Sequence, residues 1–297
     1  MENFLSHLHY LYLTKNPIVY FSIDKNKRME FKPFISHIAI YPVKSLDGIS
    51  LRKTEIAEGG CLLHDREYAI FDTEGNLING KSNPSVHTLR STVDFEKEII
   101  SFQRMNENKW YHFHLEKERM ALQHYLSQFF GVEVELKQNK TGGFLDIPEI
   151  SGITLLSTAS LQSVSEWFGG MDLNETRKRF RATVEIDGVP AFWEDHLFSN
   201  KGSAIEFQCG KVRMIGISPR ERCVVPTRHP ETGEVLHGFP KIFAKDRLTD
   251  LPGWSFLKQY GHSYYLSVDC FIPATEIGKF ICVGDELKIS GVINAAE

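Results

Sequence analysis

Hydrophobic and polar positions alternate over short runs of this chain, and turn residues separate the runs. Residues 34–41 form one such run, closed by Pro42, and residues 67–72 form another that leads into turn residues at 73–76. Residues 88–102 predict two more short strands. Short strands with turn signals at this density are typical of a barrel or a sandwich.

Two segments depart from this alternation. Residues 116–130 place apolar side chains at helical spacing, and Gly131 can end a helix in the left-handed conformation. A strand is expected to follow at 132–136, and residues 160–168 predict a second helix that ends at Gly169. The sequence therefore predicts a mainly β protein with a few helices (α+β), built as two β-barrel-like domains.

Strands resume in the second half of the chain, at residues 180–186, 204–208, 211–217 and 280–289. Cys209 and Gly210 predict a tight hairpin between two of these strands. The loop-like segment 137–151 marks a domain boundary. We therefore expect an N-terminal extension over residues 1–33, a first domain over 34–150 and a second over 151–297.

Composition excludes several classes of protein. The 297 residues are 42% hydrophobic with a formal net charge of -4, so the basic excess of a nucleic-acid-binding protein is lacking. No apolar run is long enough for a membrane helix and no secretory signal is recognised, so we expect a cytoplasmic protein. The five cysteines include no C-x-x-C pair, which leaves zinc ribbons, iron–sulfur motifs and disulfides unsupported.

The segment 220–234 carries the most informative chemistry. It reads RERCVVPTRHPETGE, with Cys223 among Arg220, Arg222, Arg228 and His229. Nearby cations favour a thiolate over a thiol, and thiolates are soft ligands for thiophilic metals. A buried structural cysteine is the competing interpretation, although the polar flanks argue against an apolar environment. A cysteine phosphatase would need C-x5-R, but His229 stands at that position.

Three other segments carry cations that could bind an anion. Lys44 and Ser45 follow a strand end, and a cation beside a hydroxyl can hold a phosphate. Arg66 precedes another strand and could bind phosphate bidentately. Residues 177–181 are the densest basic cluster, and on a strand they would place Arg179 and Arg181 on one face. For each segment, a solvated or ion-paired surface remains the alternative.

Taken together, these segments resemble MOSC proteins. The family motifs occur in order as YPVKSLDG, GGCLLHDREYAIFDTEGNL, RKRFRATVEIDG, FWED and RCVVPTRHPETGE. The first half resembles the N-terminal β-barrel domain that precedes MOSC, and the second half resembles the MOSC barrel. This arrangement is shared by the mitochondrial amidoxime reducing component, its bacterial relatives and the C-terminal part of molybdenum cofactor sulfurase.

The resemblance implies a molybdenum pyranopterin cofactor (Mo-molybdopterin), with Cys223 as metal ligand and catalytic residue. The cofactor contacts that it implies are Lys44, Ser45, Arg66, Ser157, Ser160, Arg181, Thr183 and Arg222. The family is also associated with pyridoxal phosphate binding. This chain departs from the family pattern with Thr183 for an Asn, Lys81 for an Arg, and Asp269 near the anionic cofactor.

The function implied is an oxidoreductase that removes oxygen from amidoximes, hydroxylamines or N-hydroxylated bases. Electrons are expected from a separate ferredoxin- or cytochrome b5-like protein with its reductase, because the chain lacks a ferredoxin cysteine set. No nucleic-acid or membrane partner is expected. Two alternatives stay open: a non-redox carrier of the cofactor or of sulfur that uses Cys223, and a degenerate barrel that only binds an anion.

Overall fold

A computed structural model describes residues 20–24, 27–150 and 152–294, with side chains from Phe31 onward. The extension predicted at 1–33 therefore lies largely outside the described residues. The strands are, in chain order, β1 (Tyr20–Asp24), β2 (Lys27–Glu30), β3 (Phe34–Ile40), β4 (Ile49–Leu51), β5 (Lys53–Glu55), β6 (Tyr68–Asp72), β7 (Leu89–Asp94), β8 (Ile99–Arg104), β9 (Tyr111–His114), β10 (Val134–Gln138), β11 (Ile153–Ser157), β12 (Val184–Asp187), β13 (Ser203–Cys209), β14 (Val212–Glu221), β15 (Tyr265–Phe271), β16 (Phe280–Cys282) and β17 (Leu287–Asn294).

The helices are fewer and mostly short. The α-helices are α1 (Arg119–Phe130), α2 (Thr158–Trp167), α3 (Leu173–Phe180) and α4 (Phe239–Thr249). The 3-10 helices are η1 (Pro84–Thr88), η2 (Trp193–Leu197), η3 (Val225–Thr227), η4 (Leu257–Tyr260) and η5 (Ala274–Glu276). The predicted class, mainly β with a few helices, is confirmed.

The described strands form one large sheet and several small ones. The large sheet has the order β17-β13-β14-β15-β11-β12-β3-β4. It curls, because the N–H of Ile35 donates to the carbonyl of Asp285 at 2.9 Å and the N–H of Leu287 donates to that of Pro33 at 2.8 Å. These bonds join the start of β3 to the start of β17, so the sheet is barrel-like without closing through a full ladder.

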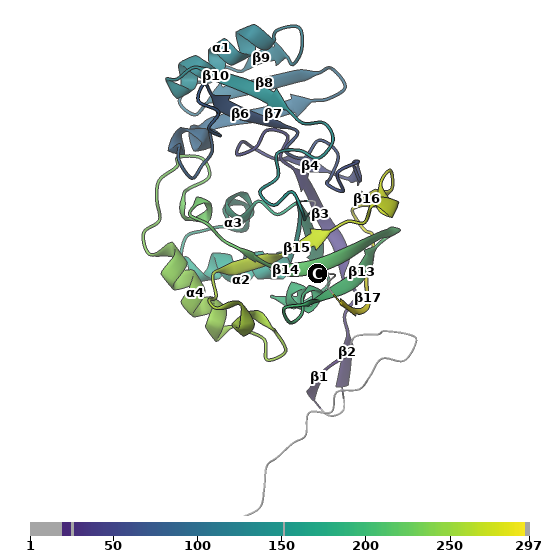
Figure 1. Ribbon diagram of the computed structural model, residues 1–297. Helices are drawn as coiled ribbons and strands as arrows, with labels where there is room; N and C mark the ends of the chain where they lie inside the picture. The colour runs from purple at the N-terminus through teal and green to yellow at the C-terminus, as the bar shows by residue number, and fades with distance from the viewer. Residues whose placement is uncertain (1–19, 25–26, 151, 295–297) are drawn as a thin grey trace, which may run out of the picture.

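The first half of the chain contributes to both lobes of the molecule. Strands β6 to β10 and helix α1 form an upper lobe, while β3 and β4 belong to the large sheet of the body below (Figure 1). Antiparallel pairing of β3 with β12, with His37 opposite Glu185, joins the two halves of the sequence. Strand pairing thus crosses the boundary predicted near residue 150, whose position stays a prediction.

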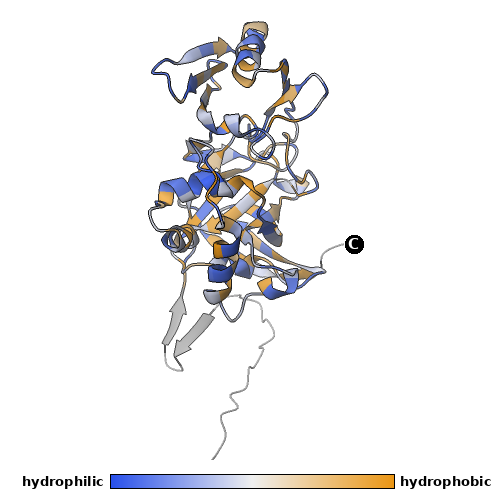
Figure 2. Ribbon diagram, turned by 90° about the vertical axis from the view of Figure 1, so that its left-hand side faces the viewer, coloured by the Kyte–Doolittle hydropathy of each residue, from blue (hydrophilic) through white to orange (hydrophobic). Residues whose placement is uncertain are grey.

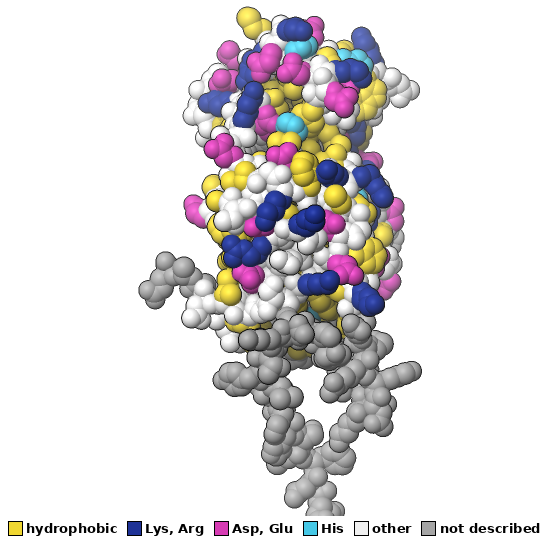
Figure 3. Space-filling view, turned by 90° about the vertical axis from the view of Figure 1, so that its right-hand side faces the viewer, with side chains coloured by type: hydrophobic (Ala, Val, Ile, Leu, Met, Phe, Trp, Pro, Cys, Tyr) yellow, Lys and Arg dark blue, Asp and Glu magenta, His cyan; other side chains and the backbone are white. Residues whose placement is uncertain are grey.

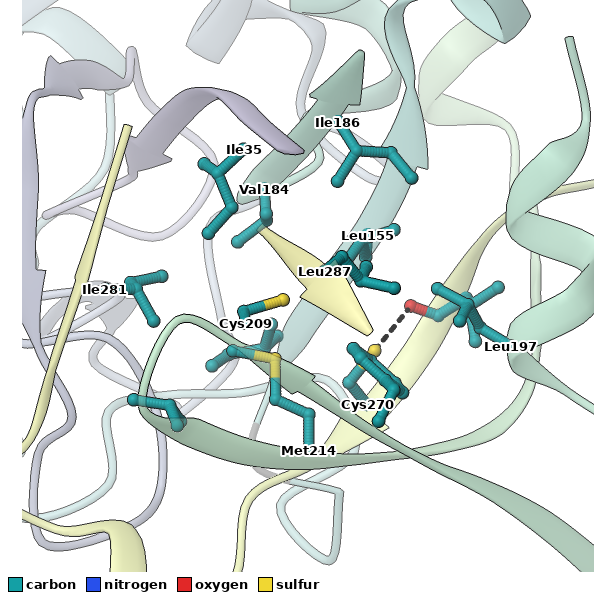
Figure 4. Close-up of a cluster of buried hydrophobic side chains, with 14 of the residues drawn as sticks. Ile35, Leu155, Val184, Ile186, Leu197, Cys209, Met214, Cys270, Ile281 and Leu287 are labelled. Carbon is teal, nitrogen blue, oxygen red and sulfur yellow. Dashed lines mark hydrogen bonds between the residues drawn. The ribbon is translucent and has the colours of Figure 1, made fainter. Parts of the chain in front are cut away.

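Each lobe has its own hydrophobic core. Hydrophobic segments gather on the strands in the middle of the body (Figure 2). There Leu155, Met214 and Leu287 pack with the buried thiols of Cys209 and Cys270 (Figure 4). The upper lobe packs α1 over its strands around a second cluster of buried side chains. All five cysteines are free thiols, of which Cys223 is exposed and Cys282 is partly exposed.

Several predicted elements are confirmed at nearly the predicted bounds. Helix α1 ends at Gly131, which has φ 70° and donates to the carbonyl of Ser127 at 2.9 Å. Strands β13 and β14 form the predicted hairpin, in which Cys209 faces Val212 and Gly210 has φ 57°.

The strand predicted at 180–186 is wrong over its first part. Residues 173–180 form α3, whose N-cap carboxylate on Asp172 accepts from the N–H of Glu175 at 2.7 Å. An acidic cap with Glu three residues later is a helix-start signal, and the basic last turn suits the negative end of the helix dipole. The basic cluster therefore lies on a helix and its C-cap, and only Val184–Asp187 is a strand.

Gly216 allows strand β14 to pack directly against the backbone of η2. A Cβ at this position would lie 1.7 Å from the carbonyl oxygen of Leu197 in η2. We expect Gly216→Ala to lower the free energy of unfolding by about 3 kcal/mol or more, because backbone rather than a flexible side chain must move. Urea denaturation measures this change. Gly169→Ala is the control, since a Cβ there meets nothing within 4 Å, and equal effects of both variants would contradict the packing argument.

Candidate functional site

A cavity of about 1080 Å³ lies between the two lobes and is lined by residues of both halves of the sequence. The first half lines it with residues from β3, the β3–β4 loop and η1. The second half contributes the C-terminal end of α3 and the segment that runs from β14 to η3. Of the predicted site residues, the cavity brings together Lys44, Ser45, Arg66, Arg181, Arg222 and Cys223.

Cys223 lies just after β14, in the turn that leads to η3, and is exposed. Its Sγ accepts a hydrogen bond from the N–H of Val225 at 3.4 Å. Its carbonyl accepts from the hydroxyl of Tyr264 at 3.2 Å, which fixes the backbone of the turn. The thiol therefore faces the cavity and is not packed in an apolar core.

The side chain of Arg222, which precedes Cys223 in the sequence, is fixed by contacts with Ser267 and Phe180. Its Nη2 donates to Oγ of Ser267 at 2.9 Å, and its guanidinium lies 5.2 Å from the ring centroid of Phe180. Burial, and then the nearby charge of Arg220, lowers the pKa of Arg222 to about 10. Its Nε is buried without a hydrogen-bond acceptor among the described residues. The group remains a cation at neutral pH with unused donor capacity.

Tyr41 holds one cation from each half of the sequence. Its ring lies 5.0 Å from the guanidinium carbon of Arg66 and 4.0 Å from that of Arg181. Its N–H donates to Asp65 at 2.8 Å, and Asp65 forms an ion pair with Arg66. Because cation–π contacts hold guanidinium groups over a ring face, Tyr41 sets the position of both arginines. Lys44 lies near them, with its N–H bonded to the carbonyl of Tyr68 at 2.8 Å.

One arginine of the basic cluster at α3 has no ion-pair partner among the described carboxylates. Arg177 pairs with Glu185, Lys178 pairs with Glu231, and Arg179 pairs with Glu175. Arg181, at the helix C-cap, forms no ion pair with a described carboxylate. Burial is the main cause that lowers the pKa of Arg181, and the nearby Arg66 adds to it.

Three non-glycine residues that line this cavity adopt the left-handed conformation, and so does Ser267, which accepts a hydrogen bond from the lining residue Arg222. Ser45 has φ 76°, Arg66 φ 55°, Arg181 φ 53° and Ser267 φ 70°. Each costs about 1 kcal/mol relative to a relaxed backbone, so the surrounding fold must enforce them. Such residues cluster at functional sites, where they aim side chains that a relaxed backbone would turn away.

Three predicted contacts do not line the cavity. Ser157 caps α2 by accepting from the N–H of Ser160 at 3.1 Å, and both serines are fully buried. Thr183 is buried against Thr154, to whose carbonyl its hydroxyl donates at 3.1 Å. These hydroxyls satisfy hydrogen bonds inside the fold, and their predicted role toward a cofactor stays a prediction.

A carboxylate that the sequence did not single out also lines the cavity. Asp146 is 2.8 Å from Nζ of Lys44 and 3.0 Å from Arg220. Burial alone would raise the pKa of Asp146, but the hydrogen bond and charge of Lys44, with Arg220, lower it to about 2. Asp269 also pairs with Arg220, at 3.2 Å, so its negative charge is compensated inside the site.

Metal-ligating side chains are sparse in the described part of the chain. Within it, His, Cys, Asp and Glu nowhere gather in groups of three that could hold a metal ion. A metal at Cys223 would therefore need most of its ligands from a cofactor.

No helix in the described residues combines the length and the apolar character needed to cross a bilayer. On the face seen from the side of β16, basic side chains lie scattered among acidic ones (Figure 3).

Comparison with known proteins confirms the resemblance that the motifs predicted. Residues 32–140 match a family model described as the MOSC N-terminal beta barrel domain. Mitochondrial amidoxime reducing component 2 of Bos taurus is 22% identical, with 71% of this chain and 71% of that protein covered. Molybdenum cofactor sulfurases of Arabidopsis thaliana and Oryza sativa subsp. japonica are 29% and 34% identical over 24% and 21% of this chain. The chain spans only 8% and 7% of the length of these two sulfurases.

Glu194 in η2 gives the region around Ser160 a predictable pH dependence. The hydroxyl of Ser160 donates to Glu194 at 2.9 Å, while burial, and then the charge of Asp195, raises the pKa of Glu194 to about 7. The folded state therefore binds this proton more tightly than the unfolded chain. The resulting stability is present below about pH 4.5 and is lost as the pH rises through about 7.

We expect the wild type to lose about 3 kcal/mol of unfolding free energy through this group between pH 4.5 and 8. The unfolding free energy of Glu194→Gln, measured by urea denaturation, should therefore change over this pH range by about 3 kcal/mol less than that of the wild type. Glu149→Gln, at an exposed carboxyl, serves as the control. Identical pH profiles for Glu194→Gln and the wild type would rule out this assignment.

Proposed function

We propose that the protein holds a molybdenum pyranopterin cofactor through Cys223 and reduces N-hydroxylated substrates with electrons from a separate donor protein. The observation that carries this proposal is the exposed thiol of Cys223 in the wall of a cavity rich in guanidinium groups. The match of residues 32–140 to the MOSC N-terminal domain and the similarity to an amidoxime reducing component support it.

The residues of the cavity fit such a group. A thiolate is a soft ligand that suits molybdenum, and Cys223 offers one sulfur with open space beside it. The cofactor is anionic, and Nε of Arg222 and Nε of Arg228 are buried without acceptors among the described residues. Oxygen atoms of a bound ligand would satisfy these donors, which otherwise leave desolvated charge unpaired.

Each lining residue has a distinct part in holding the cofactor. Lys44, Ser45 and Arg66 would bind its phosphate end, and Arg181 and Arg222 its pterin portion. Tyr41 keeps the guanidinium groups of Arg66 and Arg181 in place through the ring contacts described above. When bound, the cofactor supplies the metal-centred removal of oxygen and the two-electron step.

The overall reaction balances with an external reductant. An N-hydroxylated substrate accepts two electrons and two protons, its N–O bond breaks, and it leaves as the N–H compound with one molecule of water. Amidoximes, hydroxylamines and N-hydroxylated bases are the substrate classes. A ferredoxin- or cytochrome b5-like protein with its reductase would deliver the electrons. The chain positions the N–O group near Sγ of Cys223 and surrounds it with fixed positive charge.

We expect protein purified from a host that makes the cofactor to contain about one molybdenum per chain and to oxidise a reduced dye with benzamidoxime. Cys223→Ser should lose this turnover entirely and most of the metal. Metal analysis and a dye-coupled assay measure the two quantities. Cys282→Ser is the matched control, because Cys282 is partly exposed but lies away from the cavity.

Each other outcome selects a different function. Molybdenum without turnover would favour the non-redox carrier, in which Cys223 passes on the cofactor or its sulfur. Protein with no molybdenum at all would favour an anion-binding barrel without redox chemistry. Full turnover by Cys223→Ser would remove the basis of the proposal.

A further inference from the structure

The carboxylate of Asp146 bridges two cations that come from opposite halves of the sequence. Its Oδ1 lies 2.8 Å from Nζ of Lys44, and its Oδ2 lies 3.0 Å from Nη2 of Arg220. Lys44 lies in the loop after β3, whereas Arg220 lies on β14, and all three residues line the cavity. The two cationic groups are therefore separated by the width of one small anion, and both oxygens of that anion are engaged.

The two cations are built into the cavity walls, whereas the carboxylate between them is the more accessible partner. The side chains of Lys44 and Arg220 are 14% and 18% exposed, and that of Asp146 is 48% exposed. Arg220 is also held by Asp269, whose Oδ1 accepts from its Nη1 at 3.2 Å. The group that is free to turn toward solvent is therefore the carboxylate of Asp146.

Asp146 belongs to a segment that can release it without breaking a strand ladder. Residues 145–150 form bends and turns between β10 and β11 and belong to no helix or strand. The chain is anchored just ahead of them, where the N–H of Phe144 donates to the carbonyl of Arg66 at 2.7 Å. Turning Asp146 outward breaks two ion pairs, and ion pairs of partly exposed groups contribute little net free energy.

The charge between Lys44 and Arg220 favours a dianion as the replacement for Asp146. The tethered carboxylate acts at an effective concentration on the order of millimolar or more, so a free carboxylate of the same charge displaces it poorly. A phosphate monoester carries about two negative charges near pH 7 and three terminal oxygens. It can therefore contact both cations at once and gains more Coulombic energy from them than a carboxylate does.

We propose that Lys44 and Arg220 together form a phosphate-binding site, and that the carboxylate of Asp146 occupies this site until a phosphate monoester displaces it. The inference rests on the proposed function, which assigns the phosphate end of the cofactor to Lys44. It adds Arg220 as a phosphate ligand from the other half of the sequence. Asp146 acts as a competitor of the ligand, and it keeps the two cations neutralised while the site is empty.

Calorimetry of the cofactor-free, full-length protein with phenyl phosphate tests this exchange. Asp146→Asn should bind about tenfold more tightly than the wild type, because a site that is free in only about a tenth of the molecules binds tenfold more weakly. Asp146→Glu keeps the charge and should bind like the wild type. Asp94→Asn is the matched control, since Asp94 pairs with Lys97 at 2.7 Å and does not line the cavity. Binding by Asp146→Asn that is absent, unchanged or weaker would overturn the inference.

The role of Arg220 needs a variant that does not leave Asp269 unpaired. Arg220→Gln combined with Asp269→Asn removes both partners, and in the Asp146→Asn background it should weaken the binding of phenyl phosphate at least about tenfold. Arg213→Gln combined with Glu206→Gln is the matched control, because this pair joins β14 to β13 outside the cavity. Unchanged binding after the loss of Arg220 would refute the two-cation site.

A purely structural tether at Asp146 predicts a different result. It would lower the Tm of Asp146→Asn without raising the affinity for phosphate, whereas a competitor predicts that phenyl phosphate raises the Tm of Asp146→Asn more than that of the wild type. Asp146→Ser, which also lacks the charge, should show the same gain. Benzoate should bind at least about tenfold more weakly than phenyl phosphate, and a preference for benzoate would refute the assignment to phosphate.

These results are separable from those that test the proposed function. If benzamidoxime is not reduced, the proposed function fails, and phenyl phosphate binding by the cofactor-free protein still decides whether Asp146 occupies a phosphate site. If benzamidoxime is reduced but Asp146→Asn binds phenyl phosphate no better than the wild type, the proposed function stands and this inference fails.

Discussion

The antiparallel pairing of β3 with β12 fixes the relation between the two halves of the sequence, with His37 opposite Glu185. The chain leaves β3 directly into the loop that carries Tyr41, Lys44 and Ser45, and it enters β12 directly from the α3 cap. A slip of one residue in this register would turn every side chain of β3 to the opposite face. The closeness of Arg66 to Arg181 around one tyrosine ring therefore depends on this strand pair.

The cavity gathers many cations in a partly desolvated space, and the fold manages their repulsion in two ways. Carboxylates from neighbouring loops neutralise most of them, as Asp146 does for Lys44 and Arg220. Aromatic rings hold others, as Tyr41 does for Arg181. What remains is a small number of guanidinium groups whose charge is free to act on a ligand. In a low-dielectric site such fixed charges act more strongly than they would in water.

Local patterns predicted the elements better than they predicted the site. Helix α1 with its glycine cap and the hairpin at Cys209 depend on neighbouring residues, and both could be predicted. The basic run of helix α3 has little apolar periodicity, so the pattern favours a strand there, although Asp172 and Glu175 mark the start of a helix. The motifs singled out the cations and Cys223, but no local pattern reveals that Asp146 bridges Lys44 and Arg220. That contact depends on the long-range strand pairing.

The five thiols differ sharply in their exposure, and this has a practical consequence. Burial raises the pKa of Cys61 to about 11 and puts those of Cys209 and Cys270 well above the ordinary range. Alkylating reagents and peroxide attack accessible thiolates, so these three sulfurs are shielded from both. Oxidative damage would then fall on the two accessible thiols, and on the exposed sulfur at the cavity wall before the partly exposed Cys282. The same selectivity makes Cys223 the natural attachment point for a spectroscopic label.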